Sequence, residues 1–148
     1  MSASILRWAV EELERFLGTL RVAPLYRSAP LSPIAQPDFL NTVAVGRSRP
    51  GASGPEDVLA LGKALELEAG RVRGARFGPR PLDVDLLLYG ERRSERPELT
   101  LPHPRLLDRR FVLAPLADLC PDLLLSGRTV REWAESLAGE QRVYRVEL

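Results

Sequence analysis

The sequence predicts an α+β fold in which two main helices lie on one face of a sheet. The predicted elements follow the order helix, strand, strand, helix, strand, with short helices and a last strand behind them, which is typical of an α+β domain. The chain has 148 residues, of which 45% are hydrophobic, enough to bury a core without disulfides or a structural metal. We therefore expect residues 1–148 to form a single domain.

The first helix is expected over residues 4–17, with Ser2 or Ser4 as its cap and Gly18 after its end. Apolar residues recur in this stretch at spacings of three and four, which places them on one face of a helix. The predicted inner face consists of Ile5, Trp8, Ala9, Leu13, Phe16 and Leu17.

Two strands are expected next, over residues 22–28 and 39–45. Pro24 has no backbone N–H to donate, so the first of these strands should be irregular or lie at a sheet edge. The three prolines of residues 29–38 should hold the connection between the strands as an extended loop.

A second helix is expected over residues 55–69, where Pro55 suits the first turn and Gly70 suits the end. A glycine-punctuated loop rich in arginine follows this helix, and a third strand is expected over residues 82–89. The remaining predicted elements are a short strand over residues 99–101, helices over 110–119 and 129–138 with Thr129 as a cap, and a last strand over 143–146.

The composition excludes several classes of function. The net charge of +1 argues against a broad nucleic-acid-binding surface. No apolar run approaches the roughly 18 residues of a membrane span, and the first residues lack a secretory pattern, so a cytoplasmic protein is expected. Cys120 is the only cysteine, which rules out an intramolecular disulfide and a multi-cysteine zinc site.

Two aspartates, Asp83 and Asp85, open the predicted strand over residues 82–89. Side chains alternate across a strand, so both carboxylates should point to the same side. Two carboxylates this close repel each other unless a cation neutralises them, and Mg²⁺ takes one or two carboxylates together with phosphate oxygens. The alternative interpretation is a solvated acidic face on an edge strand.

Four arginines precede these aspartates in a loop that glycines interrupt: Arg71, Arg73, Arg76 and Arg80. The planar guanidinium group donates two parallel hydrogen bonds to a phosphate and remains charged. The glycines favour a loop that can close over a ligand. The alternative is a solvated basic loop that pairs with nearby carboxylates.

Five further side chains could contact a ligand. His103 is the only histidine, is held between two prolines, and could donate a hydrogen bond to a phosphate; Arg109 and Arg110 after it could add positive charge. Asn41 offers two donors and an acceptor, and Phe39 a stacking face, which together could bind a flat heterocycle. The alternative is a structural histidine in a turn and an ordinary aromatic residue in the core.

Four blocks of sequence are similar to one family of folate enzymes, 6-hydroxymethyl-7,8-dihydropterin pyrophosphokinase. The family signature resembles the stretch FGPRPLDVDLLLYG, which contains Asp83 and Asp85. The other blocks agree in order and spacing, and they read YRSAPLSPIAQPDFLN, ELEAGRVR and LTLPHPRLLDRRFVLAPLADLCPDL. The resemblance extends over residues 5–125.

This resemblance implies a ferredoxin-like antiparallel sheet with helices packed on it, and a monomer that acts on ATP and the pterin with two Mg²⁺ ions. Asp83 and Asp85 correspond to the metal-binding aspartates and, with Arg76 and Arg80, are the expected catalytic residues. The expected nucleotide-binding residues are Glu66, Arg73, Thr100, His103 and Arg109. The expected pterin-binding residues are Ser28, Leu31, Phe39, Asn41, Phe77 and Phe111.

One departure from the family concerns the start of the chain. Family members begin with a strand that ends in a Gly-Ser-Asn-Leu-Gly turn, whereas this sequence begins at the following helix. We therefore expect that the translation start has been placed too late. The departure also leaves open a second function, a domain of the same fold that binds pterin or nucleotide without catalysis. An RNA-binding domain fits poorly, because the aromatic residues are not adjacent on a strand.

Overall fold

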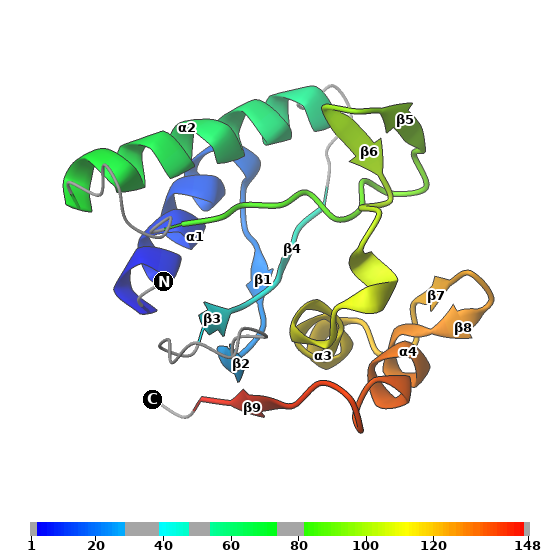
Figure 1. The fold of residues 1–148 in the computed structure, drawn as a ribbon. Helices are drawn as coiled ribbons and strands as arrows, with labels where there is room; N and C mark the ends of the chain where they lie inside the picture. Colours follow the sequence, from blue (N-terminus) through cyan, green and yellow to red (C-terminus); the bar gives the residue numbers. More distant parts are fainter. Residues whose placement is uncertain (1–2, 29–38, 48–53, 74–81, 147–148) are drawn as a thin grey trace. The chain divides into compact units, whose positions relative to one another are not determined.

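The computed structural model describes residues 3–28, 39–47, 54–73 and 82–146, without the side chains of residues 71–73. Its helices and antiparallel strands confirm the predicted α+β class (Figure 1). The chain forms two compact units. The first contains residues 1–20 and 46–104, and the second contains residues 21–45 and 105–148.

The first unit begins with helix α1, Ala3–Leu17, which has the predicted bounds to within one residue. Gly18 follows it with φ 86° and donates its N–H to the Glu14 carbonyl, so the predicted glycine stop is confirmed. Leu6 and Ala9 are buried, whereas Phe16 is 69% exposed. The prediction for Phe16 was wrong: it shares their face but lies in the last turn of α1, beyond the buried part of the helix.

Helix α2, Pro55–Arg73, packs against α1 and buries Leu65 and Ala69. Its first residue is the proline that the sequence predicted. Gly70 was predicted to end the helix, but α2 continues past it to Arg73. A glycine costs a helix interior only about 1 kcal/mol, which is too little to stop a helix that already spans four turns.

The chain from residue 82 to residue 89 runs beside α2 without forming a strand (Figure 1). The predicted strand is wrong in this respect, because no described strand pairs with this segment. Two of its backbone hydrogen bonds go instead to a helix side chain and to the backbone of residue 103. A hairpin of β5, Ser94–Arg96, and β6, Leu99–Leu101, follows and confirms the short strand predicted over residues 99–101.

The second unit contains a three-stranded antiparallel sheet in the order β3-β2-β9. Its strands are β2, Tyr26–Ser28, β3, Phe39–Asn41, and β9, Val143–Arg145. A separate pair joins β1, Arg21–Val22, to β4, Ala44–Val45. Residues 23–25 interrupt the first predicted strand at Pro24, as expected.

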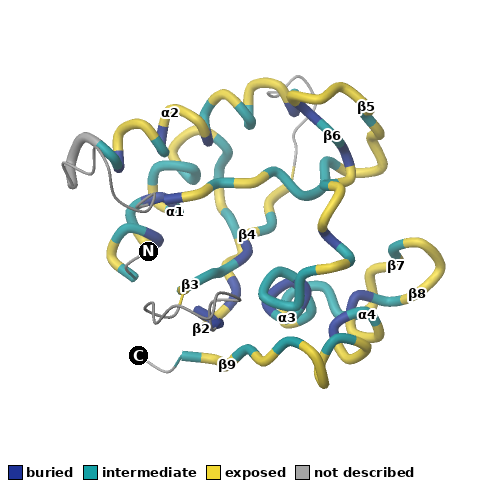
Figure 2. Tube along the Cα trace, viewed as in Figure 1, coloured by how far each residue is buried: buried dark blue, intermediate teal, exposed yellow. Residues whose placement is uncertain are grey.

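Helices of the second unit pack on each other and carry its most buried residues, which are dark blue in Figure 2. They are the 3-10 helix η1, Leu106–Asp108, and the α-helices α3, Arg110–Leu119, and α4, Val130–Ser136. Leu113 and Val130 are fully buried. A hairpin of β7, Leu124–Leu125, and β8, Arg128–Thr129, precedes α4. Thr129 forms a capping box with Glu132, which confirms the predicted cap.

Candidate active site

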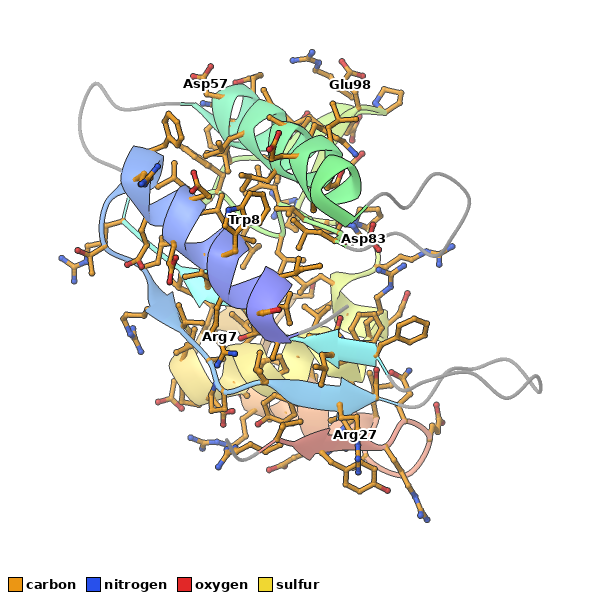
Figure 3. The ribbon with its side chains drawn as sticks, turned by 90° about the vertical axis from the view of Figure 1, so that its left-hand side faces the viewer. Arg7, Trp8, Arg27, Asp57, Asp83 and Glu98 are labelled. Atoms are coloured by element: carbon orange, nitrogen blue, oxygen red, sulfur yellow. The ribbon has the colours of Figure 1, made fainter. Side chains whose placement is uncertain are left out.

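The two predicted metal-binding aspartates lie on the exposed side of the segment 82–89 in the first unit. Asp83 and Asp85 are exposed, Val84 between them is half-buried, and Leu82 is 2% exposed. Figure 3 shows Asp83 beside the C-terminal part of α2. The alternation predicted for a strand is therefore present here, although the strand pairing is not.

Glu66 fixes this segment to α2 at the residue between the two aspartates. Its Oε2 accepts a hydrogen bond from the backbone N–H of Val84 at 2.9 Å. The side chain of Glu66 is 15% exposed, and its Oε1 lies 3.6 Å from Nζ of Lys63. The predicted nucleotide-side glutamate is thus also the anchor of the aspartate segment.

A close contact one turn earlier in α2 supports the same arrangement. Gly62 lies four residues before Glu66, so both face the same neighbour. A Cβ placed on Gly62 would be 3.0 Å from Cγ1 of Val84. The absence of a side chain at this position therefore allows the segment to approach the helix.

A second anchor holds the other end of the segment. The backbone N–H of His103 donates to the carbonyl of Leu87 at 2.9 Å. His103 is half-buried and comes directly after β6 and Pro102. Thr100 on β6 donates its hydroxyl to the carbonyl of Arg96 at 3.0 Å, within its own hairpin. Of the predicted residues, the structure therefore joins Glu66, the two aspartates and His103 through one segment.

The carboxylates suit a hard cation that completes its coordination from elsewhere. Among the residues that the structure describes, no group of three or more His, Cys, Asp or Glu side chains could hold a metal ion. Asp83 and Asp85 supply two exposed carboxylates on one side of the chain. Mg²⁺ is commonly held by one or two carboxylates, with phosphate oxygens and waters in the other positions.

In the second unit, three predicted pterin-binding residues lie on neighbouring strands. Ser28 on β2 pairs in register with Phe39 on β3, and Asn41 lies two residues farther along β3. Nδ2 of Asn41 donates to Oγ of Ser28 at 3.5 Å. Ser28 is buried, Asn41 is half-buried and Phe39 is 41% exposed. The neighbouring strands β2 and β3 therefore bring together an amide, a hydroxyl and an exposed aromatic ring.

The connection between η1 and α3 carries two more predicted residues of the second unit. The guanidinium of Arg109 lies over the ring of Phe111, 5.5 Å from its centroid. Arg110 was considered as a further positive group for phosphate. Its guanidinium instead donates to the backbone carbonyls of Ala134 at 3.2 Å and Gln141 at 3.1 Å. The side chain of Arg110 therefore bonds the protein backbone.

A polar cluster that the sequence did not reveal ties the sheet of the second unit to α3. The hydroxyl of Tyr26 donates to Asp118 at 2.5 Å, and Arg145 donates to the same carboxylate at 2.8 Å. Burial of Tyr26, and then its hydrogen bond to Asp118, raise the pKa of its hydroxyl. Tyr26 and Ser28 belong to the same short strand, so this cluster also fixes the strand that carries a predicted pterin contact.

Some predicted site residues lie outside the part of the chain that the structure describes. They are Leu31, Arg76, Phe77 and Arg80, together with the side chain of Arg73. The predicted pterin contact of Phe77, and the predicted closure of the arginine loop, therefore stay predictions.

The first unit carries the paired carboxylates predicted for a metal and phosphate, and the second carries the hydroxyl, amide and aromatic groups predicted for a flat heterocycle, a combination expected of a phosphoryl-transfer enzyme. Residues 1–121 match the family described as 7,8-dihydro-6-hydroxymethylpterin-pyrophosphokinase. The chain belongs to this family, which confirms the resemblance seen in the four sequence blocks.

Individual relatives agree with the family match. A 2-amino-4-hydroxy-6-hydroxymethyldihydropteridine pyrophosphokinase of Pseudomonas aeruginosa is 47% identical over 127 residues, covering 84% of this chain and 76% of that protein. The enzyme of the same name from Methylorubrum extorquens is 38% identical, covering 95% of this chain and 90% of that protein. A mitochondrial folate synthesis bifunctional protein of Arabidopsis thaliana is 43% identical, and 74% of this chain matches 19% of its length.

Proposed function

We propose that this chain transfers the pyrophosphoryl group of ATP to the hydroxymethyl oxygen of 6-hydroxymethyl-7,8-dihydropterin, giving the pterin diphosphate and AMP for folate biosynthesis. Membership of the pyrophosphokinase family supports this reaction. The observation that carries it in the structure is the pair Asp83 and Asp85, exposed on a segment that Glu66 holds at Val84 and His103 holds at Leu87.

The first unit supplies the groups proposed for ATP and metal. Asp83 and Asp85 would hold Mg²⁺, with two ions expected, and the bound cation would neutralise polyphosphate charge during transfer. The proposed nucleotide contacts are His103, Thr100 and Glu66. The arginines proposed to bind the phosphates are Arg73, Arg76 and Arg80. Phosphoryl transfer needs mainly positioning and charge neutralisation, and a segment anchored at Val84 and Leu87 suits this need.

The second unit supplies the groups proposed for the pterin. Ser28 and Asn41 offer a hydroxyl and an amide that could bind the donor and acceptor edge of the heterocycle. Phe111 and, from the first unit, Phe77 are proposed to contact the two faces of the ring, and Leu31 and Phe39 are proposed as further pterin contacts. Arg109, which lies over Phe111, is proposed to bind ATP phosphate. The attacking group is the substrate alcohol, so the reaction requires no nucleophile from the protein.

A direct assay of AMP formation tests the proposal. The purified chain is incubated with ATP, the pterin and Mg²⁺, and parallel samples omit one component at a time. We expect AMP and the pterin diphosphate in equal amounts, and neither product when the pterin or Mg²⁺ is left out.

Calorimetric titration of the same preparation, with the pterin and a non-hydrolysable ATP analogue, separates catalysis from binding. A chain that binds both ligands but forms no AMP would contradict the proposal and would favour the binding domain without catalysis. A chain that hydrolyses ATP to AMP equally well without the pterin would contradict it as well.

A further inference from the structure

Gln141 lies between α4 and β9, beyond residues 1–121 that match the family. It is half-buried, and nothing in the sequence around it indicates a function. The structure places its side chain against the connection between η1 and α3. This connection carries Arg109, a proposed phosphate ligand, and leads into Phe111, a proposed pterin contact.

The amide of Gln141 bonds the backbone on both sides of Arg109. Its Nε2 donates to the carbonyl of Asp108 at 2.8 Å. Its Oε1 accepts from the backbone N–H of Arg110 at 2.8 Å. The orientation of the amide is fixed by these partners, because a carbonyl can only accept and an N–H can only donate.

The side chain of Arg110 forms hydrogen bonds in the opposite direction, from the start of α3 to the backbone of residues 134 and 141. Its Nε donates to the carbonyl of Ala134, and its guanidinium donates to the backbone carbonyl of Gln141. The backbone next to Arg109 is therefore joined to residues 134–141 by hydrogen bonds in both directions. The side chains of Gln141 and Arg110 are thus bonded to backbone, whereas the guanidinium of Arg109 lies over the ring of Phe111.

The conformation of Arg109 shows why such a clamp matters. Arg109 is extended, with φ −120° and ψ 105°, between the end of η1 and the start of α3. A rotation about its backbone would turn its guanidinium away from the ring of Phe111 and would shift the first turn of α3. Fixing the carbonyl before Arg109 and the N–H after it restrains this rotation.

We propose that Gln141 is a positioning residue for substrate binding, because its amide clamps the backbone on both sides of Arg109 and so sets the directions of Arg109 and Phe111. The proposal rests on the function proposed above. It makes the C-terminal segment of this chain a part of the binding machinery rather than only of the fold.

Two variants of Gln141 and one matched control test the clamp. Gln141→Met keeps the length of the side chain and removes both hydrogen bonds. Gln141→Glu keeps the acceptor for Arg110 but places a carboxylate oxygen against the carbonyl of Asp108. Thr129→Ala removes the capping box of α4 and lowers stability without touching the connection.

Steady-state kinetics and hydrogen exchange are measured well below the melting temperature of every variant. For Gln141→Met we expect KM for the pterin and for ATP to rise. The ratio kcat/KM should fall about tenfold for each substrate, because loss of the two backbone hydrogen bonds weakens the positioning of Arg109 and Phe111. The amide of Arg110 should exchange faster. Gln141→Glu should show a similar loss, and Thr129→Ala should retain wild-type kinetics.

The outcomes separate this proposal from the proposed function. An inactive wild-type chain would overturn both. An active wild type with unchanged kcat/KM in Gln141→Met would overturn the positioning role alone. A loss that Thr129→Ala reproduces at equal stability would overturn it too, because general loosening of the second unit would then account for the effect.

Discussion

Two segments carry the proposed site, and each is held by a side chain that bonds backbone next to a proposed ligand-binding residue. In the first unit, the carboxylate of Glu66 accepts the N–H of Val84, between Asp83 and Asp85. In the second unit, the amide of Gln141 bonds the carbonyl before Arg109 and the N–H after it. The anchors differ in charge and in their distance along the chain.

The charge of each anchor has a different consequence. Glu66 adds a carboxylate close to two others, and like charges destabilise one another unless a cation compensates them. Lys63 provides part of this compensation at 3.6 Å. Gln141 is neutral and leaves the positive charge of Arg109 available for a phosphate. We therefore expect a bound cation to stabilise the first segment and a bound anion to stabilise the second.

The largest expected effect comes from the acidic pair itself. Asp83→Ala or Asp85→Ala should lower the rate of AMP formation by orders of magnitude while the fold is retained, because each removes a carboxylate proposed to hold Mg²⁺. Glu95→Gln on the exposed face of β5 serves as a control for loss of one surface carboxylate. Rates are measured at saturating substrate, with circular dichroism as the check on folding. Near-normal turnover in either alanine variant would refute the metal role.

The next effect separates anchoring from charge at Glu66. Glu66→Ala leaves the N–H of Val84 without its acceptor and should lower the free energy of unfolding by about 1–3 kcal/mol, with a drop in kcat. Glu66→Gln keeps an acceptor oxygen, so it should retain most of the stability. Urea unfolding and steady-state kinetics provide the measurements.

The kinetics of Glu66→Gln then show whether the negative charge of Glu66 contributes to ATP binding. A rise in KM for ATP with unchanged stability would support the proposed nucleotide contact. Equal stability in Glu66→Ala and the wild type would contradict the anchor.

Features whose determinants are local could be predicted from the sequence. The bounds of α1, the proline at the start of α2 and the capping box of Thr129 all depend on residues within a few positions of one another. The position of the aspartates on one exposed side also followed from alternation along the chain.

Other features depend on partners far along the chain, and these could not be predicted. Gln141 meets Arg110 across 31 positions, and Arg145 meets Asp118 across 27. The sequence suggested that Arg110 adds positive charge for phosphate. Its side chain instead bonds the carbonyls of Ala134 and Gln141, and partners this far along the chain leave no local pattern. The strand predicted over residues 82–89 was wrong for a similar reason: strand pairing needs a neighbour, and alternation alone does not supply one.

A smaller effect is expected from the close contact at Gly62. Gly62→Ala should gain about 1 kcal/mol in helix propensity, but its Cβ meets Val84 at 3.0 Å and should displace the aspartate segment. We therefore expect little net change in stability and a several-fold loss of kcat. Gly70→Ala is the matched control in the same helix, because a Cβ placed there meets none of the described atoms outside its own helix turn within 4 Å.

The melting temperatures and kcat of these two glycine variants are compared. Gly70→Ala should stabilise the protein, since it gains helix propensity and meets no close atom among the described residues. An equal gain of stability in Gly62→Ala, with unchanged kcat, would show that the approach of the segment to α2 does not matter for activity.

The smallest expected effect concerns the second unit at alkaline pH. Burial and the hydrogen bond to Asp118 raise the pKa of Tyr26 above its ordinary value of 10.0, so the folded state favours the neutral hydroxyl. The stability from this group is complete below the unfolded pKa and is lost as the pH rises through the folded pKa. The free energy of unfolding should therefore fall more steeply above about pH 10 in the wild type than in Tyr26→Phe. Urea unfolding at a series of pH values measures both slopes, and parallel curves would show that Tyr26 does not link protonation to the attachment of β2 to α3.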